Sequence, residues 1–199
     1  ITKIELENIL TNKTINQDHI YINNIRNYEL TDKESFINSL EINNINYIFN
    51  GTKLIIKKGN YILTKNIIVP LNVKTVIKKG TNFKLSKDIS ILIQGDFYAE
   101  GTEEENISVS RYEKNSPFGT FAIIGRENKN KVKFNNFIIE GGSEASIEGM
   151  VFLGQLSIHN SELQITNSKI IGSTSDDGAN IRNSYVEIFN TTFSNNKFD

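Results

Sequence analysis

A short stretch recurs three times along the chain and decides the fold: residues 54–59 are LIIKKG, residues 75–80 are TVIKKG and residues 96–101 are DFYAEG. Successive copies follow at a regular 21-residue spacing, and each ends in a glycine after two or more apolar residues. An internal repeat of this length predicts stacked structural units, because each unit needs its neighbour to bury its apolar face.

The C-terminal part of the chain also repeats, at a 23-residue spacing. Two pairs of tetrapeptides show it: IHNS at 158–161 with IRNS at 181–184, and ITNS at 165–168 with IFNT at 188–191. The FNNF stretch at 134–137 fits the same template one unit earlier, with Phe134 in the place of Ile165, but the interval between them is longer. We assign the additional residues in that interval to a loop insertion around residues 142–149.

Within these units, apolar residues recur at every second position. Val132 and Phe134 alternate with lysines, and Leu163 and Ile165 alternate with Glu and Gln. This alternation is typical of a half-buried strand, and about three such strands fit in each unit. Three short strands in each repeat unit predict a parallel β-helix of about six coils, stacked about 4.8 Å apart.

The predicted stack explains part of an unusual composition. Ile and Asn together make up about 30% of the chain, far above their average usage. In the stack Asn167 lies over Asn190, and Asn160 lies over Asn183. Asparagine tolerates the left-handed backbone of a corner and can hydrogen-bond to its copy in the next coil, while stacked Ile side chains fill the interior.

The first 50 residues lack the repeat, and we predict that 1–50 form an N-terminal cap and 51–199 the β-helix. TDKE at 31–34 matches a capping box, and the following apolar residues Phe36, Ile37 and Leu40 predict a helix of about ten residues. The Asn50-Gly51 pair is typical of a turn joining cap and helix. A cap is expected, because the first coil would otherwise expose its core and strand edges. A small independent module is the alternative, with few large apolar residues of its own.

Composition excludes several classes of protein. The 199-residue chain has no Cys, two His and a net charge of −1. It therefore has no disulfide framework or thiolate metal site, and no stretch approaches the roughly 18 uninterrupted apolar residues of a membrane span. No aromatic and basic surface pattern indicates nucleic-acid binding, and neither a glycine-rich phosphate loop nor a Ser-His-Asp constellation is present.

Three stretches carry a resemblance to a known family: NIIVP at 66–70, VKTVIKKGT at 73–81 and IQGDFYAEGT at 93–102. They resemble the opening coils of right-handed parallel β-helix repeat proteins of the pectin-lyase-like superfamily, and the similarity covers roughly residues 55–199. The resemblance implies an all-β fold, a right-handed coil, a carbohydrate context and a secreted or cell-surface location. Members include polysaccharide lyases, glycoside hydrolases, uronate epimerases and non-catalytic surface proteins. The lyases among them typically use Asp or Glu with Ca²⁺ and an Arg or Lys base.

Lysines are concentrated in one part of the chain, since residues 51–90 carry nine Lys and one Asp. At the 21-residue offset Lys53 lies over Lys74 and Lys57 over Lys78, and all four point outward if the apolar residues between them point inward. Like charges on neighbouring strands repel, so we interpret these lysines as a binding site for an acidic polysaccharide. The alternative is that they solvate an exposed sheet face and prevent edge pairing.

A second candidate site is acidic. At the 23-residue offset Asp176 aligns with Asp199, which would place their carboxylates about 5 Å apart on adjacent coils, with Asp177 beside them. Stacked carboxylates repel unless a proton or a cation lies between them, which predicts a Ca²⁺ site at Asp176 and Asp199. They could equally form an acid/base pair for glycoside chemistry, with Arg182 as the base or charge partner of a lyase-type reaction. Asp176, Asp177, Asp199 and Arg182 are therefore the candidate catalytic residues, and their alternative role is that of ordinary corner residues.

Two other features are predicted to have no functional role. The acidic run at 103–105 is expected to be a solvated loop. His159 aligns with Arg182 at an outward position and is expected to be an ordinary surface histidine.

Two function classes remain open: a non-catalytic glycan-binding or surface-attachment module, and a lyase, hydrolase or epimerase acting on an acidic glycan. The candidate acids and base span two coils at most, which favours the first class. Asp199 falls within a 23-residue coil without a closing cap. We therefore expect a fragment of a larger carbohydrate-associated protein, or a last coil covered by further chain, a partner or a second copy.

Overall fold

The computed structural model describes residues 5–8, 13–16, 33–126 and 128–197. Most of this part folds into three parallel sheets, and consecutive strands of the chain pass from one sheet to the next. Strands β1 (Glu5–Asn8) and β2 (Lys13–Asn16) form a separate antiparallel pair. The described chain is thus an all-β arrangement of parallel sheets, compatible with a β-helix-like solenoid.

The seven-stranded sheet provides one side of every coil. In spatial order it contains β21 (Tyr185–Phe189), β18 (Ser161–Thr166), β13 (Asn130–Asn135), β10 (Phe97–Glu100), β7 (Lys74–Ile77), β4 (Lys53–Ile56) and β3 (Tyr47–Phe49). All its strand pairs are parallel except β3 with β4.

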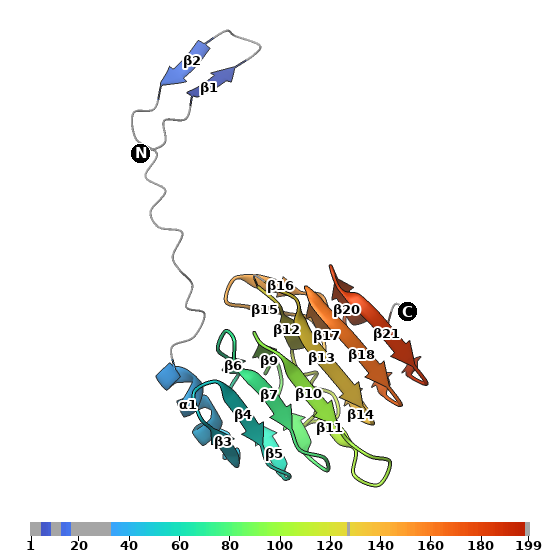
Figure 1. The fold of residues 1–199 in the computed structure, drawn as a ribbon. Helices are drawn as coiled ribbons and strands as arrows, with labels where there is room; N and C mark the ends of the chain where they lie inside the picture. Colours follow the sequence, from blue (N-terminus) through green and yellow to red (C-terminus); the bar gives the residue numbers. More distant parts are fainter. Residues whose placement is uncertain (1–4, 9–12, 17–32, 127, 198–199) are drawn as a thin grey trace.

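The other two sheets complete the coils. The six-stranded sheet contains β22 (Thr192–Ser194), β19 (Lys169–Ile171), β14 (Phe137–Glu140), β11 (Ile107–Arg111), β8 (Asn82–Leu85) and β5 (Asn60–Leu63). The five-stranded sheet contains β20 (Asp177–Arg182), β17 (Gly154–His159), β12 (Phe121–Ile124), β9 (Ile91–Ile93) and β6 (Ile67–Val69). Figure 1 shows α1 and β3 at one end of the stack and β20 and β21 at the other.

Most of the predicted repeat is confirmed by strand register. Lys53 pairs with Lys74, as the first repeat predicts, and Ile158 pairs with Ile181, as the second predicts. Ile165 pairs with Ile188 on one side and with Phe134 on the other. The sequence intervals between these residues therefore do mark neighbouring coils.

One predicted alignment is wrong by one residue. Thr75 pairs with Phe97 and not with Asp96, so the third copy of the repeat lies one position further along than its glycine suggests. Because side chains alternate across a sheet, this shift exchanges the inward and outward positions of β10. Phe97 and Ala99 are fully buried, and Asp96 and Tyr98 take the outer positions. Burial of the Phe97 ring decides the register, which glycine spacing did not reveal.

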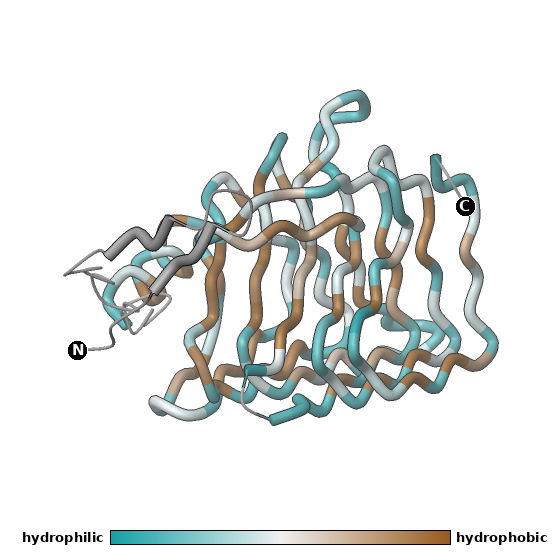
Figure 2. Tube along the Cα trace, turned by 90° about the horizontal axis from the view of Figure 1, so that it is seen from above, coloured by the Kyte–Doolittle hydropathy of each residue, from teal (hydrophilic) through white to brown (hydrophobic). Residues whose placement is uncertain are grey.

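The interior of the coils is filled by aromatic and aliphatic side chains. Phe134 lies at the centre, with ring centroids 5.1 Å from Phe97 and 4.7 Å from Phe137. Phe121 contacts the same group at 5.4 Å from Phe97. Figure 2 shows apolar segments recurring in successive coils. This continuous core is the main stabilising feature of the stack, since a buried Phe removes its whole ring from water.

Asparagines form the predicted ladders at two corners. Asn190 Nδ2 donates to Asn167 Oδ1 at 2.7 Å, and Asn183 Nδ2 donates to Asn160 Oδ1 at 3.1 Å. All four residues have φ between 47° and 51°. The ladder prediction and its left-handed backbone are confirmed.

The helix before the first coil packs on the same core as the coils. Helix α1 (Lys33–Ile42) buries Phe36 and Leu40 in that core, and the predicted helix is confirmed over these residues. Asn43 follows the helix and ties it to the first coil, because its Oδ1 accepts from Thr64 N and Lys65 N. Residues 31 and 32 of the predicted capping box lie outside the described residues.

The predicted insertion around residues 142–149 forms a hairpin. Strands β15 (Ala145–Ile147) and β16 (Met150–Phe152) pair in antiparallel fashion. Phe152 and Ile147 pack with Leu92 and Ala122, and all four are buried. The hairpin therefore covers part of the outer face of the five-stranded sheet.

The last described coil is much more exposed than the others. Val186 and Ile188 are each 43% exposed, and Phe193 is 40% exposed. Within the described residues, no helix is long and apolar enough to cross a membrane.

Candidate functional site

Four outward lysines on and beside β4 and β7 form a compact basic patch: Lys53, Lys57, Lys74 and Lys78. Lys53 pairs directly with Lys74, and Lys78 N donates to Ile56 O, which places Lys78 beside Lys57. All four side chains are exposed, while Leu54 and Ile77 between them are buried. The alternation predicted from sequence is thus present in the geometry.

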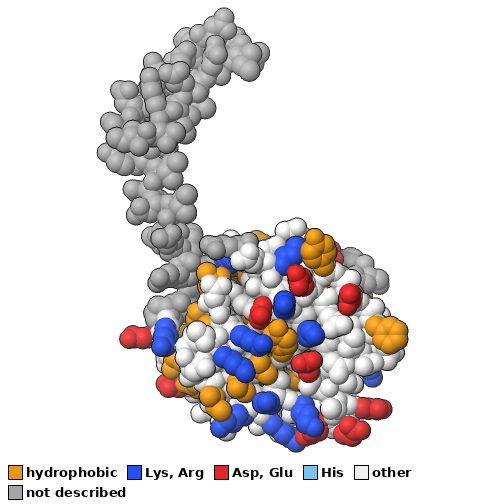
Figure 3. All heavy atoms as spheres, viewed as in Figure 1, with side chains coloured by type: hydrophobic (Ala, Val, Ile, Leu, Met, Phe, Trp, Pro, Cys, Tyr) orange, Lys and Arg blue, Asp and Glu red, His pale blue; other side chains and the backbone are white. Residues whose placement is uncertain are grey.

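The basic patch has an apolar strip along its middle. Ile55 pairs with Val76, both half-buried, and Val76 pairs with Tyr98 on β10. Lys74 Nζ lies 4.2 Å from the centroid of the Tyr98 ring, within cation–π range. Figure 3 shows Lys and Arg side chains gathered on this face, with hydrophobic side chains among them. A charged rim around an apolar strip can bind a ligand that has both anionic groups and apolar ring faces.

Two carboxylates at and beside β10 lie next to the basic patch. The register of β7 with β10 places Asp96 beside Lys74 and Glu100 beside Lys78. Asp96 Oδ1 accepts from the backbone N of Lys131 at 2.9 Å. Sequence reasoning missed these neighbours because it placed β10 one residue out of register. The two patch lysines on the β7 side therefore have carboxylates on the neighbouring strand, although they form none of the ion pairs of the described residues.

Further along the same face lies a hollow of about 530 Å³. Tyr98 and Tyr185 lie at its borders, together with Lys131, Lys133 and Glu162 from β13 and β18. Lys129 Nζ lies 4.8 Å from the Tyr185 ring centroid. The hollow extends the patch toward the C-terminal coils with mixed charges and aromatic rings.

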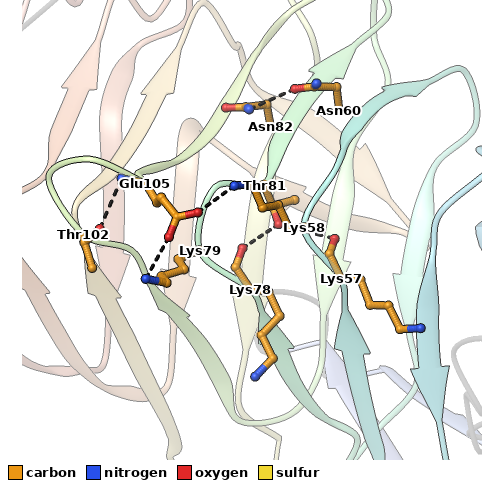
Figure 4. A network of polar contacts seen from close by, with 9 residues as sticks. All are labelled: Lys57, Lys58, Asn60, Lys78, Lys79, Thr81, Asn82, Thr102 and Glu105. Carbon is orange, nitrogen blue, oxygen red and sulfur yellow. Dashed lines mark hydrogen bonds and ion pairs between the residues drawn. The ribbon is translucent and has the colours of Figure 1, made fainter.

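The acidic run at 103–105 is not simply solvated, which corrects the prediction. Glu105 forms ion pairs with Lys58 at 2.6 Å and Lys79 at 2.7 Å (Figure 4). The hydrogen bonds from these two ammonium groups hold the pKa of the Glu105 carboxyl at about 2. The same pairing raises the pKa of Lys79. Glu105 thus pairs with two lysines beside the patch and with none of the patch lysines.

The ion pairs of the described residues support this division. They join Lys58 and Lys79 to Glu105, and Lys87 to Asp88. None involves a lysine of the basic patch.

The acidic candidates lie elsewhere, near β20 of the five-stranded sheet. Asp177 Oδ2 accepts from Asn180 Nδ2 at 2.6 Å, and Asn180 Oδ1 is 3.1 Å from His159 Nε2. Because an amide oxygen only accepts, Nε2 carries the proton in this contact. Arg182 pairs with His159 across β20 and β17, as predicted.

His159 is less exposed than predicted. Its half-buried ring stacks on Phe152 of the hairpin at 5.4 Å. Burial lowers the pKa of His159, which favours its neutral imidazole. Sequence alignment could place His159 beside Arg182, but could not show that the hairpin inserted before β17 folds back over it.

The predicted calcium site is only partly within the described residues. Asp176 is exposed, and Asp199 lies outside the described residues, so their pairing stays a prediction. No group of three or more His, Asp or Glu side chains in the described part is arranged to hold a metal ion. The carboxylate next to Asp176 in the chain, that of Asp177, accepts a hydrogen bond from an amide.

Comparison of the chain with protein-family models, with curated proteins and with solved structures found no match.

Proposed function

We propose that this chain is a right-handed parallel β-helix module that binds an acidic polysaccharide through the basic patch. The handedness and the pectin-lyase-like character come from the sequence resemblance. A secreted or cell-surface protein is the setting in which such a module would meet its ligand. The observation that carries the proposal is the arrangement of the basic patch. Its exposed lysines form two rows across β4 and β7, Lys53 with Lys74 and Lys57 with Lys78, and these rows flank an apolar strip.

The electrostatic cost of this arrangement supports a ligand. Neighbouring strands are about 4.8 Å apart, and like charges placed directly opposite each other are destabilising. Lys58 and Lys79 share the Glu105 carboxylate, yet no described acidic side chain forms an ion pair with Lys53, Lys57, Lys74 or Lys78. A polyanion lying across the strands would relieve the repulsion of both rows at once.

The apolar strip favours a carbohydrate among polyanions. Sugar rings present C–H faces that pack on aliphatic and aromatic side chains, and Tyr98 lies at the end of the strip beside Lys74. The carboxylates of a uronate polymer would then lie over the lysine rows. Acidic polysaccharide is accordingly the ligand class that uses both features.

The direct test is binding of polygalacturonate by isothermal calorimetry. The double variant Lys57→Glu plus Lys78→Glu should abolish measurable binding, because it replaces one whole lysine row with carboxylates. The matched control is Lys65→Glu plus Lys114→Glu, which changes the net charge equally at exposed positions outside the patch. Fully methyl-esterified pectin, which has the same backbone without the charge, should bind weakly or not at all.

Two results would overturn the proposal. One is wild-type protein that binds no acidic polysaccharide in low salt. The other is equal loss of affinity in the patch variant and the control variant, which would show that net charge alone controls binding.

A second candidate function is a lyase, hydrolase or epimerase acting on an acidic glycan. The observation that favours it is the hydrogen-bonded series from Asp177 through Asn180 to His159, with Arg182 on the same strand as Asp177 and paired with His159. A neutral imidazole whose Nε2–H is held by Asn180 has Nδ1 as its proton-accepting atom, and Arg182 could pair with a uronate carboxylate.

This candidate is tested by incubating the protein with polygalacturonate and alginate. Unsaturated products would be followed by ultraviolet absorbance and hydrolytic products by reducing ends, with and without Ca²⁺. Activity lost in both His159→Ala and Asp177→Asn would establish that the protein is an enzyme that uses these residues. Activity unchanged by both substitutions would exclude these residues from the chemistry.

A further inference from the structure

A second groove lies at the corner between the seven-stranded and six-stranded sheets, away from the basic patch. It has a volume of about 520 Å³ and crosses several coils. Asn136, Asn167 and Asn190 line it from three consecutive coils, and Asn106 lines it from the loop before β11. We call this the corner groove.

The lining asparagines supply more than a turn conformation. Asn136, Asn167 and Asn190 have φ of 47°, 50° and 47°, a region that glycine adopts with less strain. The amides of Asn167 and Asn190 instead belong to a ladder, since Asn190 Nδ2 donates to Asn167 Oδ1 and Asn167 Nδ2 donates to Asn135 Oδ1 at 3.0 Å, while Asn136 Nδ2 donates to Gly101 O. Each of these bonds uses one of the two N–H donors of an amide, so Asn136, Asn167 and Asn190 each keep a second N–H to bind a further group.

The charge in the corner groove is balanced, in contrast to the basic patch. Its lining contains one carboxylate, Glu103, and one ammonium group, Lys169. Ile138 adds an apolar surface. A row of neutral amides beside an aliphatic side chain suits a ligand whose groups both donate and accept hydrogen bonds and which also has apolar faces.

One wall of the corner groove is held in place before any ligand binds. Glu103 and Asn106 flank Glu105, whose side chain pairs with Lys58 and Lys79 (Figure 4). Glu105 N also donates to Thr102 Oγ1 at 3.2 Å, and Glu105 O accepts from Gly80 N at 3.1 Å. A loop fixed by these contacts loses little conformational freedom on binding, which favours affinity.

We propose that the corner groove binds an uncharged carbohydrate, whose hydroxyl groups pair with the asparagine amides of successive coils. This site is distinct from the acidic-polysaccharide site, because it lies on later coils of the stack and uses none of the patch lysines. Its ligand is distinguished by chemistry, since neutral sugar hydroxyls match amides whereas carboxylates match ammonium groups.

The test measures binding of the neutral hexaoses of cellulose, starch, mannan and xylan by calorimetry and by ¹H–¹⁵N NMR titration. At least one should bind, with shifts centred on Asn136, Asn167 and Asn190. Asn190→Gly should weaken that binding about tenfold, because it removes a ligand-facing amide while glycine keeps the left-handed backbone. Asn106→Ala, at the same corner position one coil before Asn136, should weaken it similarly.

Asn183→Gly is the matched control. Asn183 has the same φ range and the same ladder bond, to Asn160, but lies at another corner. It should leave neutral-sugar binding unchanged, and polygalacturonate affinity should be unchanged in all three variants. The proposal is overturned if none of the hexaoses binds at millimolar concentration, or if Asn183→Gly weakens binding as much as Asn190→Gly and Asn106→Ala do.

Discussion

At the scale of single residues, lysines that are adjacent in the chain differ in whether they form ion pairs. Glu105 draws Lys58 and Lys79 into ion pairs and fixes a loop. Lys57 and Lys78 of the basic patch, each one position earlier in the chain, remain exposed and outside this network. The sequence shows both sets as one basic stretch, and only the position of Glu105 separates them.

The Glu105 ion pairs predict a specific pH dependence. The pKa of Glu105 in the folded protein is about 2, below its ordinary value of 4.5. Stabilisation by these ion pairs is therefore fully present above about pH 4.5 and is lost as pH falls toward 2. Glu105→Gln should lower the melting temperature at pH 6 and have little effect at pH 2.

The control for this experiment is Glu144→Gln, at an exposed carboxylate outside the network. It should leave the melting temperature unchanged at both pH values. A Glu105→Gln effect of the same size at pH 2 and pH 6 would show that the ion pairs are not its cause.

At the scale of elements, the backbone at Gly95 lies very close to the preceding coil. Gly95 stands just before β10, the strand whose register against β7 differs from the prediction. A Cβ at Gly95 would collide with the backbone carbonyl of Val73. Backbone atoms cannot move aside as a flexible side chain can. Gly95 thus lets the third coil approach the second just before Asp96 turns outward.

Substitution at Gly95 should therefore destabilise the protein. We expect Gly95→Ala to cost about 1–3 kcal/mol of unfolding free energy, the usual range for overpacking a buried site. Gly59→Ala should cost less, because its new methyl would meet the Tyr61 ring and not backbone. Urea unfolding of both variants measures the difference, and an equal or smaller cost at Gly95 would contradict this explanation of the register.

The elements also show what sequence could predict. The period of two, the regular repeat intervals and the preference of Asn for left-handed corners are local properties, and they predicted the strands, the stacking of Lys53 on Lys74 and the ladder of Asn167 and Asn190. The offset of Phe97 depends on core packing across coils, and the ion pairs of Glu105 join residues far apart in the chain. Such long-range contacts leave no periodic trace in the sequence.

At the scale of the whole molecule, the stack is closed at one end and open at the other over the residues that the structure describes. Helix α1 buries Phe36 and Leu40 against the first coil, while β21 and β22 expose Val186, Ile188 and Phe193. In a stacked architecture each coil is stabilised chiefly by its neighbours. A coil with one neighbour is expected to open more often than a coil with two.

Hydrogen exchange should show this gradient. We expect the slowest amide exchange in β10, β12 and β13, which carry the buried Phe97, Phe121 and Phe134, and the fastest in β21 and β22. Mass spectrometry of peptides from each coil measures it. Uniform protection from β4 to β22 would contradict the gradient and indicate that the exposed coil is covered in solution.

An NMR titration with oligogalacturonate tests whether the face of β4 and β7 binds an acidic glycan. We expect saturable amide shifts concentrated in β4, β7 and the neighbouring Tyr98, which diminish as salt screens the lysines. Shifts concentrated instead on β17 and β20, or no shifts at saturating oligogalacturonate, would contradict it.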